Sequence, residues 1–91
     1  MNKLFQNYPN TFNPSTTISY QLANDSKVNL KIYDLLGRDV ASVVDEEKTA
    51  GYQQEVFSAG TMSSGVYIYR IIYADKSGKL ASAHKTMMLL K

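Results

Sequence analysis

Few residues in this 91-residue chain could perform chemistry, and the only histidine, His84, is the first to consider. A nucleophilic triad needs a base and a group that orients the base. No acidic or hydroxyl side chain stands at a diagnostic spacing from His84, and the serines lie in turns or on predicted strand faces. We therefore interpret His84 as a surface histidine and the serines as turn formers.

Metal and redox chemistry have equally little support. The chain has no cysteine, which excludes disulfides, thiolate zinc sites and cysteine nucleophiles. The one acidic cluster, Asp45 to Glu47, could offer oxygen ligands to calcium. It lacks the alternating ligands of a calcium loop, and Lys48 follows it directly, so we predict a solvated loop. Paired carboxylates for glycoside hydrolysis need a cleft, for which so small a domain has little room. The sequence predicts neither an enzyme nor a bound cofactor.

Aromatic side chains raise the question of carbohydrate binding, because the chain has 7 tyrosines and no tryptophan. Sugar sites commonly use flat aromatic platforms. Tyr67 and Tyr69, however, lie at i and i+2 of one predicted strand, a spacing that packing within a sheet also produces. We predict that these two are packed, and that Tyr8 and Tyr33 are the more exposed candidates for a platform.

Length and charge limit the possible classes further. The chain is long enough for one domain. A formal net charge of +2, with basic residues scattered singly, predicts no nucleic-acid partner. No apolar run approaches the roughly 18–20 residues that span a bilayer. The first ten residues lack the apolar stretch of a signal peptide, so any export signal lies elsewhere or is the domain itself.

Alternating apolar and polar residues recur along the chain, and this period of two is typical of half-buried strands. The predicted strands cover residues 16–22, 28–33, 40–44, 52–57 and 66–73, with a last strand inside 80–90. No stretch shows the 3.6-residue repeat of a helix. About six or seven short strands with regular turn signals predict an antiparallel two-sheet sandwich, and a small barrel fits the same pattern.

Turn residues separate these strands. The segment from Ala23 to Lys27 contains Asn and Asp, which bond their own backbone. In "YDLLGRDV", Asp34 can accept backbone N–H bonds and Gly37 can take the positive φ that closes a short hairpin loop. After the strand that ends at Val44, "DEEKTAG" is predicted to be a charged loop ending in Gly51.

Four blocks of the sequence carry a family resemblance. They are "LFQNYPNTFNPSTTISYQL" (residues 4–22), "KIYDLLGRDVASVVDEEKTAG" (31–51), "SSGVYIYRI" (63–71) and "KTMMLLK" (85–91). In this order and spacing they resemble the type A C-terminal sorting domain of the type IX (Por) secretion system. The positions that match its motifs are Asn7, Pro9, Asn13, Pro14, Tyr33, Asp34, Gly37, Arg38, Gly65, Tyr67, Tyr69 and Arg70.

The resemblance implies an immunoglobulin-like antiparallel sandwich of about seven strands, related to FlgD-like domains of flagellar-hook capping proteins. It implies a non-catalytic module attached to an upstream cargo domain that is absent from this chain. Its expected partners are the outer-membrane secretion machinery and a sortase-like peptidase, which attaches the cargo to a surface glycolipid. The cargo would cross the periplasm and reach the cell surface or the medium.

One position departs from the family pattern. Thr11 stands where the family usually has proline, so Asn10 is freed from the extended bias that a following proline imposes. We expect the segment from Pro9 to Pro14 to be looser than in relatives.

The chain ends on an apolar segment, which suggests a binding surface. If Tyr67, Tyr69 and Ile71 face inward, the residues between them form an unusually apolar outer face. In the last segment one of two alternating pairs must also face outward. An outward apolar patch often marks a binding site, and we predict that recognition involves Val66, Ile68, Ile72, Lys85, Met88, Leu90 and Lys91.

Two further expectations accompany this prediction. An exposed terminal strand can pair with another chain, so weak self-association through this edge is expected. The rival function is a structural or carbohydrate-contacting spacer in a surface enzyme, because the fold alone does not decide the role.

Overall fold

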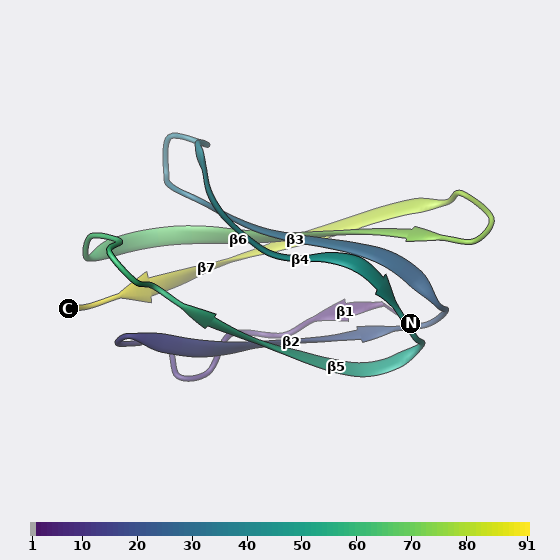
Figure 1. Cartoon of the computed structure of the whole chain (residues 1–91), viewed down its shortest axis with the longest axis horizontal. Coiled ribbons are helices and arrows are strands. Elements are labelled where there is room, and N and C mark those ends of the chain that lie inside the picture. The colour runs from purple at the N-terminus through teal and green to yellow at the C-terminus, as the bar shows by residue number, and fades with distance from the viewer. Residues whose placement is uncertain (1) are drawn as a thin grey trace.

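The computed structural model describes residues 2–91 and shows two antiparallel sheets packed as a sandwich (Figure 1). One sheet has the order β1-β2-β5 and the other β4-β3-β6-β7. The strands are β1 (Lys3–Leu4), β2 (Ser15–Leu22), β3 (Ser26–Tyr33), β4 (Asp39–Lys48), β5 (Gly51–Ser58), β6 (Gly65–Asp75) and β7 (Leu80–Leu89). The predicted sandwich is confirmed. Across residues 2–91 no helix is long and apolar enough to cross a membrane.

The core lies between the two sheets and follows directly from the alternation in the sequence. Every second residue of β2 and β3 is buried, because successive side chains of a strand point to opposite faces. Tyr69 and Ile71 of β6 are fully buried, and so are Leu30 of the neighbouring strand β3 and Ile18 of β2 in the facing sheet. The prediction that Tyr67, Tyr69 and Ile71 face inward is therefore confirmed.

The prediction of a charged loop beginning at Asp45 was wrong, because β4 continues through the acidic cluster to Lys48. Asp45 lies opposite Asn29 of β3, and the pairing continues to Lys48. β4 is an edge strand, where charged side chains can reach solvent without leaving the sheet. Asp45 also pairs with Lys27 at 3.9 Å, and Glu46 with Lys48 at 3.3 Å. Ion pairs along and across the strand thus let the acidic residues remain extended.

The β3–β4 hairpin loop confirms the role predicted for Asp34 and Gly37. The Asp34 carboxylate accepts the backbone N–H groups of Leu36 and Arg38 at 2.9 and 3.0 Å, and Gly37 has a φ of 84°. A second loop, between β6 and β7, repeats this arrangement. Asp75 accepts from the N–H groups of Ser77 and Lys79, and Gly78 has a φ of 85°.

The segment from β1 to Phe12 joins the two sheets, and no sequence pattern predicted this role. β1 pairs with β2 in one sheet. The chain then crosses to β7 in the other sheet, where Phe12 exchanges backbone hydrogen bonds with Met88 and Leu90. Phe12 is 1% exposed and packs edge-on against Phe57, with ring centroids 6.3 Å apart. We call residues 3–12 the N-terminal strap.

Candidate functional site

Two of the motif tyrosines are structural anchors. The Tyr67 hydroxyl donates to the backbone oxygen of Ser63 at 2.6 Å, which is the local bond of a tyrosine corner. The Tyr69 hydroxyl donates to the Phe5 backbone oxygen at 2.7 Å and accepts from the Asn7 N–H at 2.9 Å. Burial raises the pKa of Tyr69 to about 12, so its hydroxyl stays protonated and able to donate. Tyr69 thereby ties β6 to the N-terminal strap.

The "QNYP" block is held by a buried side-chain network around Asn7. The Asn7 amide nitrogen donates to the Thr16 hydroxyl at 3.0 Å and to the Pro9 backbone oxygen at 3.1 Å. The Thr16 hydroxyl donates to the same Pro9 oxygen at 2.8 Å. Asn7 and Thr16 are each 2% exposed. Sequence reasoning missed Thr16; a polar residue at an inward position of the predicted strand was the available signal.

The outer face of β6 and β7 carries most of the residues proposed for recognition. The two strands are paired along their length, and Val66 lies directly opposite Met88. Ile68 lies beside Tyr33 of β3 and Ile72 beside Asn29. Met88 is 46% exposed, whereas Val66, Ile68 and Ile72 are half-buried. The geometry leaves Met88 outside and places Met87 and Leu89 in the core. We call Val66, Ile68 and Met88 the apolar patch.

A row of basic residues crosses the same face next to this patch. Arg70 of β6 lies opposite His84 of β7 on one side and Lys31 of β3 on the other. Lys31 is paired with Asp39 at 3.0 Å. An open hollow of about 500 Å³ has Ile68, Arg70 and His84 in its lining. This row separates Ile72 from the apolar patch, so the predicted apolar residues do not form one continuous surface.

The remaining recognition residues lie apart from the apolar patch. Lys85 lies opposite the inward-facing Tyr69, so it projects to the opposite side of the sheet from Met88. Leu90 follows the end of β7 and is 61% exposed. Lys91 is tied to the loop before β6, because its backbone N–H donates to the Ser64 hydroxyl and its ammonium donates to the Gly60 backbone oxygen, both at 2.9 Å.

Comparison with known proteins places this arrangement in a family. The sequence matches the family of secretion system C-terminal sorting domains over residues 6–83. The chain belongs to this family. The resemblance carried by the four sequence blocks is thereby confirmed, and the domain is a sorting signal of type IX secretion. Proteins with this domain are destined for the cell surface or the extracellular space.

Solved structures share the fold of this sorting domain. Dimeric latent PorU from Porphyromonas gingivalis contains a region with a TM-score of 0.76 and 20% identity, which covers 99% of this chain and 9% of PorU. The sorting domain therefore spans about a tenth of that protein. CopC from Methylosinus trichosporium OB3b aligns with a TM-score of 0.62 and 10% identity over 98% of this chain and 93% of CopC. No curated protein matches the sequence.

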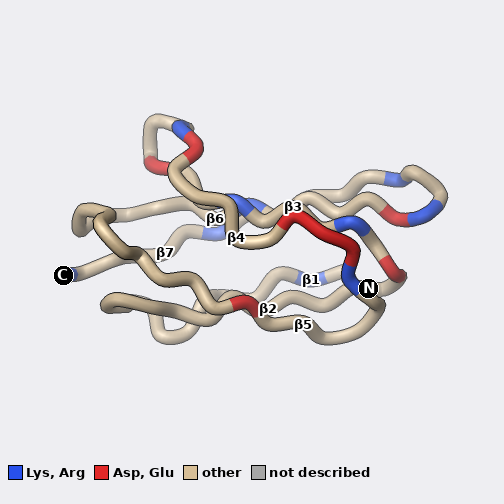
Figure 2. The backbone as a smooth tube through the Cα atoms, viewed as in Figure 1, with Lys and Arg blue, Asp and Glu red and all other residues tan. Residues whose placement is uncertain are grey.

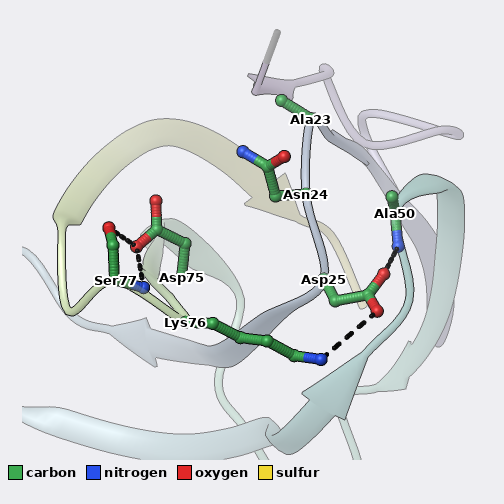
Figure 3. Close-up of a pocket in the computed structure, with 7 residues that line it drawn as sticks. All are labelled: Ala23, Asn24, Asp25, Ala50, Asp75, Lys76 and Ser77. Atoms are coloured by element: carbon green, nitrogen blue, oxygen red, sulfur yellow. Dashed lines mark hydrogen bonds and ion pairs between the residues drawn. The ribbon is translucent and has the colours of Figure 1, made fainter.

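A hollow at one end of the sorting domain, about 530 Å³ in volume, is formed by turns rather than by a catalytic constellation (Figure 3). The Asp25 carboxylate faces Lys76 at 4.0 Å and accepts the Ala50 N–H at 2.8 Å. Asp75 accepts from both the N–H and the hydroxyl of Ser77. These bonds hold neighbouring turns in place. Within residues 2–91 no three acidic or histidine side chains are grouped to bind a metal ion.

A partly buried polar cluster between the sheets of the sorting domain has a structural role. The Tyr20 hydroxyl donates to the Glu55 carboxylate at 2.7 Å, and Lys48 lies 3.3 Å from the same carboxylate. Burial, followed by the bond to Glu55, raises the pKa of Tyr20. The cluster links β2, β5 and β4. Its groups satisfy one another, as buried polar groups generally do.

Proposed function

We propose that this sorting domain directs an attached cargo through the outer membrane, and that the secretion machinery recognises the apolar patch together with Leu90. The observation that carries the proposal is the pairing of β6 with β7, which places Val66 beside the exposed Met88. Exposed apolar patches with polar rims often mark interaction sites. Methionine is flexible and polarizable, so it adapts to an irregular partner surface.

The finer steps of this proposal concern partners and route. The cargo domain precedes the sorting domain in the same chain, and the protein passes through the periplasm. At the surface a sortase-like peptidase recognises the folded domain and transfers the cargo to its anchor. In this proposal the sorting domain supplies recognition only and no catalytic group.

The experiment is export of a passive reporter fused to the domain in a host that has type IX secretion. Met88→Glu and Leu90→Glu should each reduce export to background while the melting temperature stays unchanged, because both side chains are exposed. Val56→Glu is the matched control, since Val56 is an apolar residue on β5 with 73% exposure. Wild-type export of the Met88→Glu variant would rule out the patch as the recognised surface.

Point variants are needed because a deletion would confound two effects. Removing residues 87–91 would take away Met87 and Leu89, which are each 1% exposed. Losing a buried large side chain typically costs about 2–5 kcal/mol. An export defect in that deletion would therefore report unfolding as much as lost recognition.

A second candidate function is carbohydrate contact, which a specific observation favours. On the outer face of the other sheet, a hollow of about 370 Å³ is lined by Phe5, Tyr8 and Tyr52, with Gln54 and Ser19 beside them. Tyr8 is 81% exposed and Tyr52 is 57% exposed. The outward residues of β2 and β5 carry no charge. Aromatic rings beside amides and hydroxyls would suit a neutral glycan.

Titration with neutral oligosaccharides, followed by tyrosine fluorescence or NMR, tests this candidate. Tyr52→Ala should abolish a binding signal that Val56→Ala leaves intact, because Val56 lies on the same face outside the hollow lining. Absence of any shift at millimolar glycan would exclude this function while leaving the sorting proposal standing.

A further inference from the structure

β7 is an edge strand, and its open side is only partly covered. Met88 donates its N–H to the Asn10 side chain at 2.9 Å and accepts the Phe12 N–H at 3.0 Å, so its backbone groups face away from β6. Along a strand these groups alternate in direction, and residues two apart face the same side. The backbone N–H and C=O groups of Ser82 and His84 therefore also face the open side.

The N-terminal strap is hydrogen-bonded to one half of this edge, whereas along the other half β1 lies close to β7 without such bonds among residues 2–91. Gln6 donates to the Thr86 backbone oxygen at 2.8 Å, and Phe12 pairs with Met88 and Leu90. Within residues 2–91, no side chain or loop bonds the outward backbone groups of Ser82 or His84. The half without these hydrogen bonds is residues 80–84, which we call the open edge. It is the earlier half of β7 and not the terminal tail.

The charges around the open edge are mainly positive, although the carboxylate of Asp75 lies at the β6–β7 turn beside Lys76 and Lys79. β7 contains no acidic residue. Arg70 and Lys85 form no ion pair in the described part of the chain, whereas Lys27, Lys31 and Lys48 all do. Figure 2 shows the contrast, with acidic residues along β4 at the opposite edge of the same sheet and basic residues on β6 and β7. The open edge thus presents free backbone groups beside uncompensated cations.

We propose that the open edge binds an extended acidic peptide segment of the secretion machinery, which adds to the sheet as a further strand beside β7. This rests on the proposed function and names the chemistry of the partner. An added strand lies about 4.8 Å from its neighbour. Carboxylates on the outer face of the added strand would approach His84, and also Arg70, because the side chain of Ser82 is small. Carboxylates on the inner face of that strand would approach Lys85. Arg70 and Ser82 border two open hollows of about 500 and 220 Å³ that leave room for such side chains.

A second copy of this chain fits the open edge less well. Pairing two open edges would bring Lys85 and His84 of one copy close to those of the other, and like charges repel. Pairing with the acidic edge of another copy would compete with ion pairs that already occupy Asp45 and Glu46. A separate acidic segment meets neither obstacle.

The test uses the intact chain and two synthetic peptides, one of alternating glutamate and valine and one with lysine in place of glutamate. Amide hydrogen exchange and NMR shifts are followed residue by residue at low salt. The acidic peptide should slow exchange at Ser82 and His84 by at least about tenfold, and added salt should weaken this protection. Equal protection by both peptides, protection confined to β4, or protection that appears without peptide as protein concentration rises would overturn the proposal.

Two variants sharpen the result. Ser82→Pro removes an N–H that faces the open side, so the fold should survive while acidic-peptide affinity falls at least about tenfold. The double variant Arg70→Glu with Lys85→Glu should reverse the preference and bind the lysine peptide. If the double variant keeps the acidic preference, the charge argument is wrong.

Export assays separate this proposal from the proposed function. In the reporter fusion, Ser82→Pro should block export although the apolar patch is intact. Normal export of Ser82→Pro together with lost export of Met88→Glu would refute the open edge and leave the apolar patch standing. The reverse pattern would refute the patch and keep the open edge.

Discussion

Two buried tyrosines of β6, Tyr69 and Tyr73, differ in what their hydroxyl groups contact. Tyr69 bonds two backbone groups of the N-terminal strap. Tyr73 is 3% exposed, and its hydroxyl is a buried polar atom with no hydrogen-bond partner among residues 2–91. Burial raises the pKa of both side chains. A buried hydroxyl stabilises a fold only when it is bonded, so the two rings should respond differently to its removal.

We therefore expect different outcomes for two matched substitutions. Tyr69→Phe leaves the Phe5 oxygen and the Asn7 N–H unbonded and should cost about 1–3 kcal/mol of unfolding free energy. That corresponds to a melting temperature lower by about 4–8 °C for each kcal/mol. Tyr73→Phe should be neutral or stabilising. Thermal and urea unfolding measure both, and equal losses in the two variants would contradict this account.

At the scale of elements, the β3–β4 and β6–β7 loops of the four-stranded sheet share one arrangement of residues. Each has an aspartate at its first position, a glycine in the left-handed region three residues later, and a basic residue after that. The bonds that the aspartates accept, from the Arg38 N–H at Asp34 and from the Ser77 hydroxyl at Asp75, hold both carboxyl pKa values below the usual 3.8. The loops depend on charged carboxylates.

This dependence predicts an acid-sensitive contribution to stability. Because the folded-state pKa values are lowered, the two carboxylates stabilise the fold at pH above their unfolded value. That contribution is lost as the pH falls through the lower folded-state values. Replacing both by asparagine, in the double variant Asp34→Asn with Asp75→Asn, should flatten the fall in melting temperature below about pH 4. If the melting temperature of the double variant falls below about pH 4 as steeply as that of the wild type, other carboxylates govern acid unfolding.

At the scale of the whole molecule, the N-terminal strap closes the sandwich. It pairs with β2 in one sheet and with the end of β7 in the other, and Phe12 fills the space between them. Because it also covers the terminal half of the β7 edge, it determines which part of that edge can meet a partner. The looseness expected from Thr11 stays a prediction, although Asn10 and Phe12 on either side of it are bonded to β7.

Removing the Phe12 ring should weaken both the closure of the sandwich by the strap and the covering of the β7 edge. Phe12→Ala should cost about 3–5 kcal/mol, a large fraction of the 5–15 kcal/mol that stabilises a typical domain. The amides of Phe12 and Leu90 should lose protection in hydrogen exchange at the same time. Phe5→Ala is the control, since Phe5 is only half-buried and should cost much less. Unchanged protection in Phe12→Ala would mean that the strap is held by its polar contacts alone.

Much of the fold could be predicted because local pattern and local chemistry decide it. The alternation in residues 16–22 and 66–73 places the inward residues correctly, and the aspartate–glycine spacing predicts the β3–β4 loop. The prediction failed at Asp45 to Lys48, because charge alone was taken to mark a loop. On an edge strand, charged residues can extend the sheet when ion pairs and solvent are both within reach.

By itself the sequence determined the strands over residues 16–22, 28–33 and 66–73 with their inward faces, and the family, since these depend on the order and spacing of side chains along the chain. It could not decide whether Met87 or Met88 faces outward, because alternation allows either choice until β7 is paired with β6. Only the tertiary structure decided that, together with the covering of the β7 edge by the strap and the separation of Lys85 from Met88. Each of these depends on contacts between segments far apart in the chain, as much as 80 residues for Gln6 and Thr86, and no local pattern records such contacts.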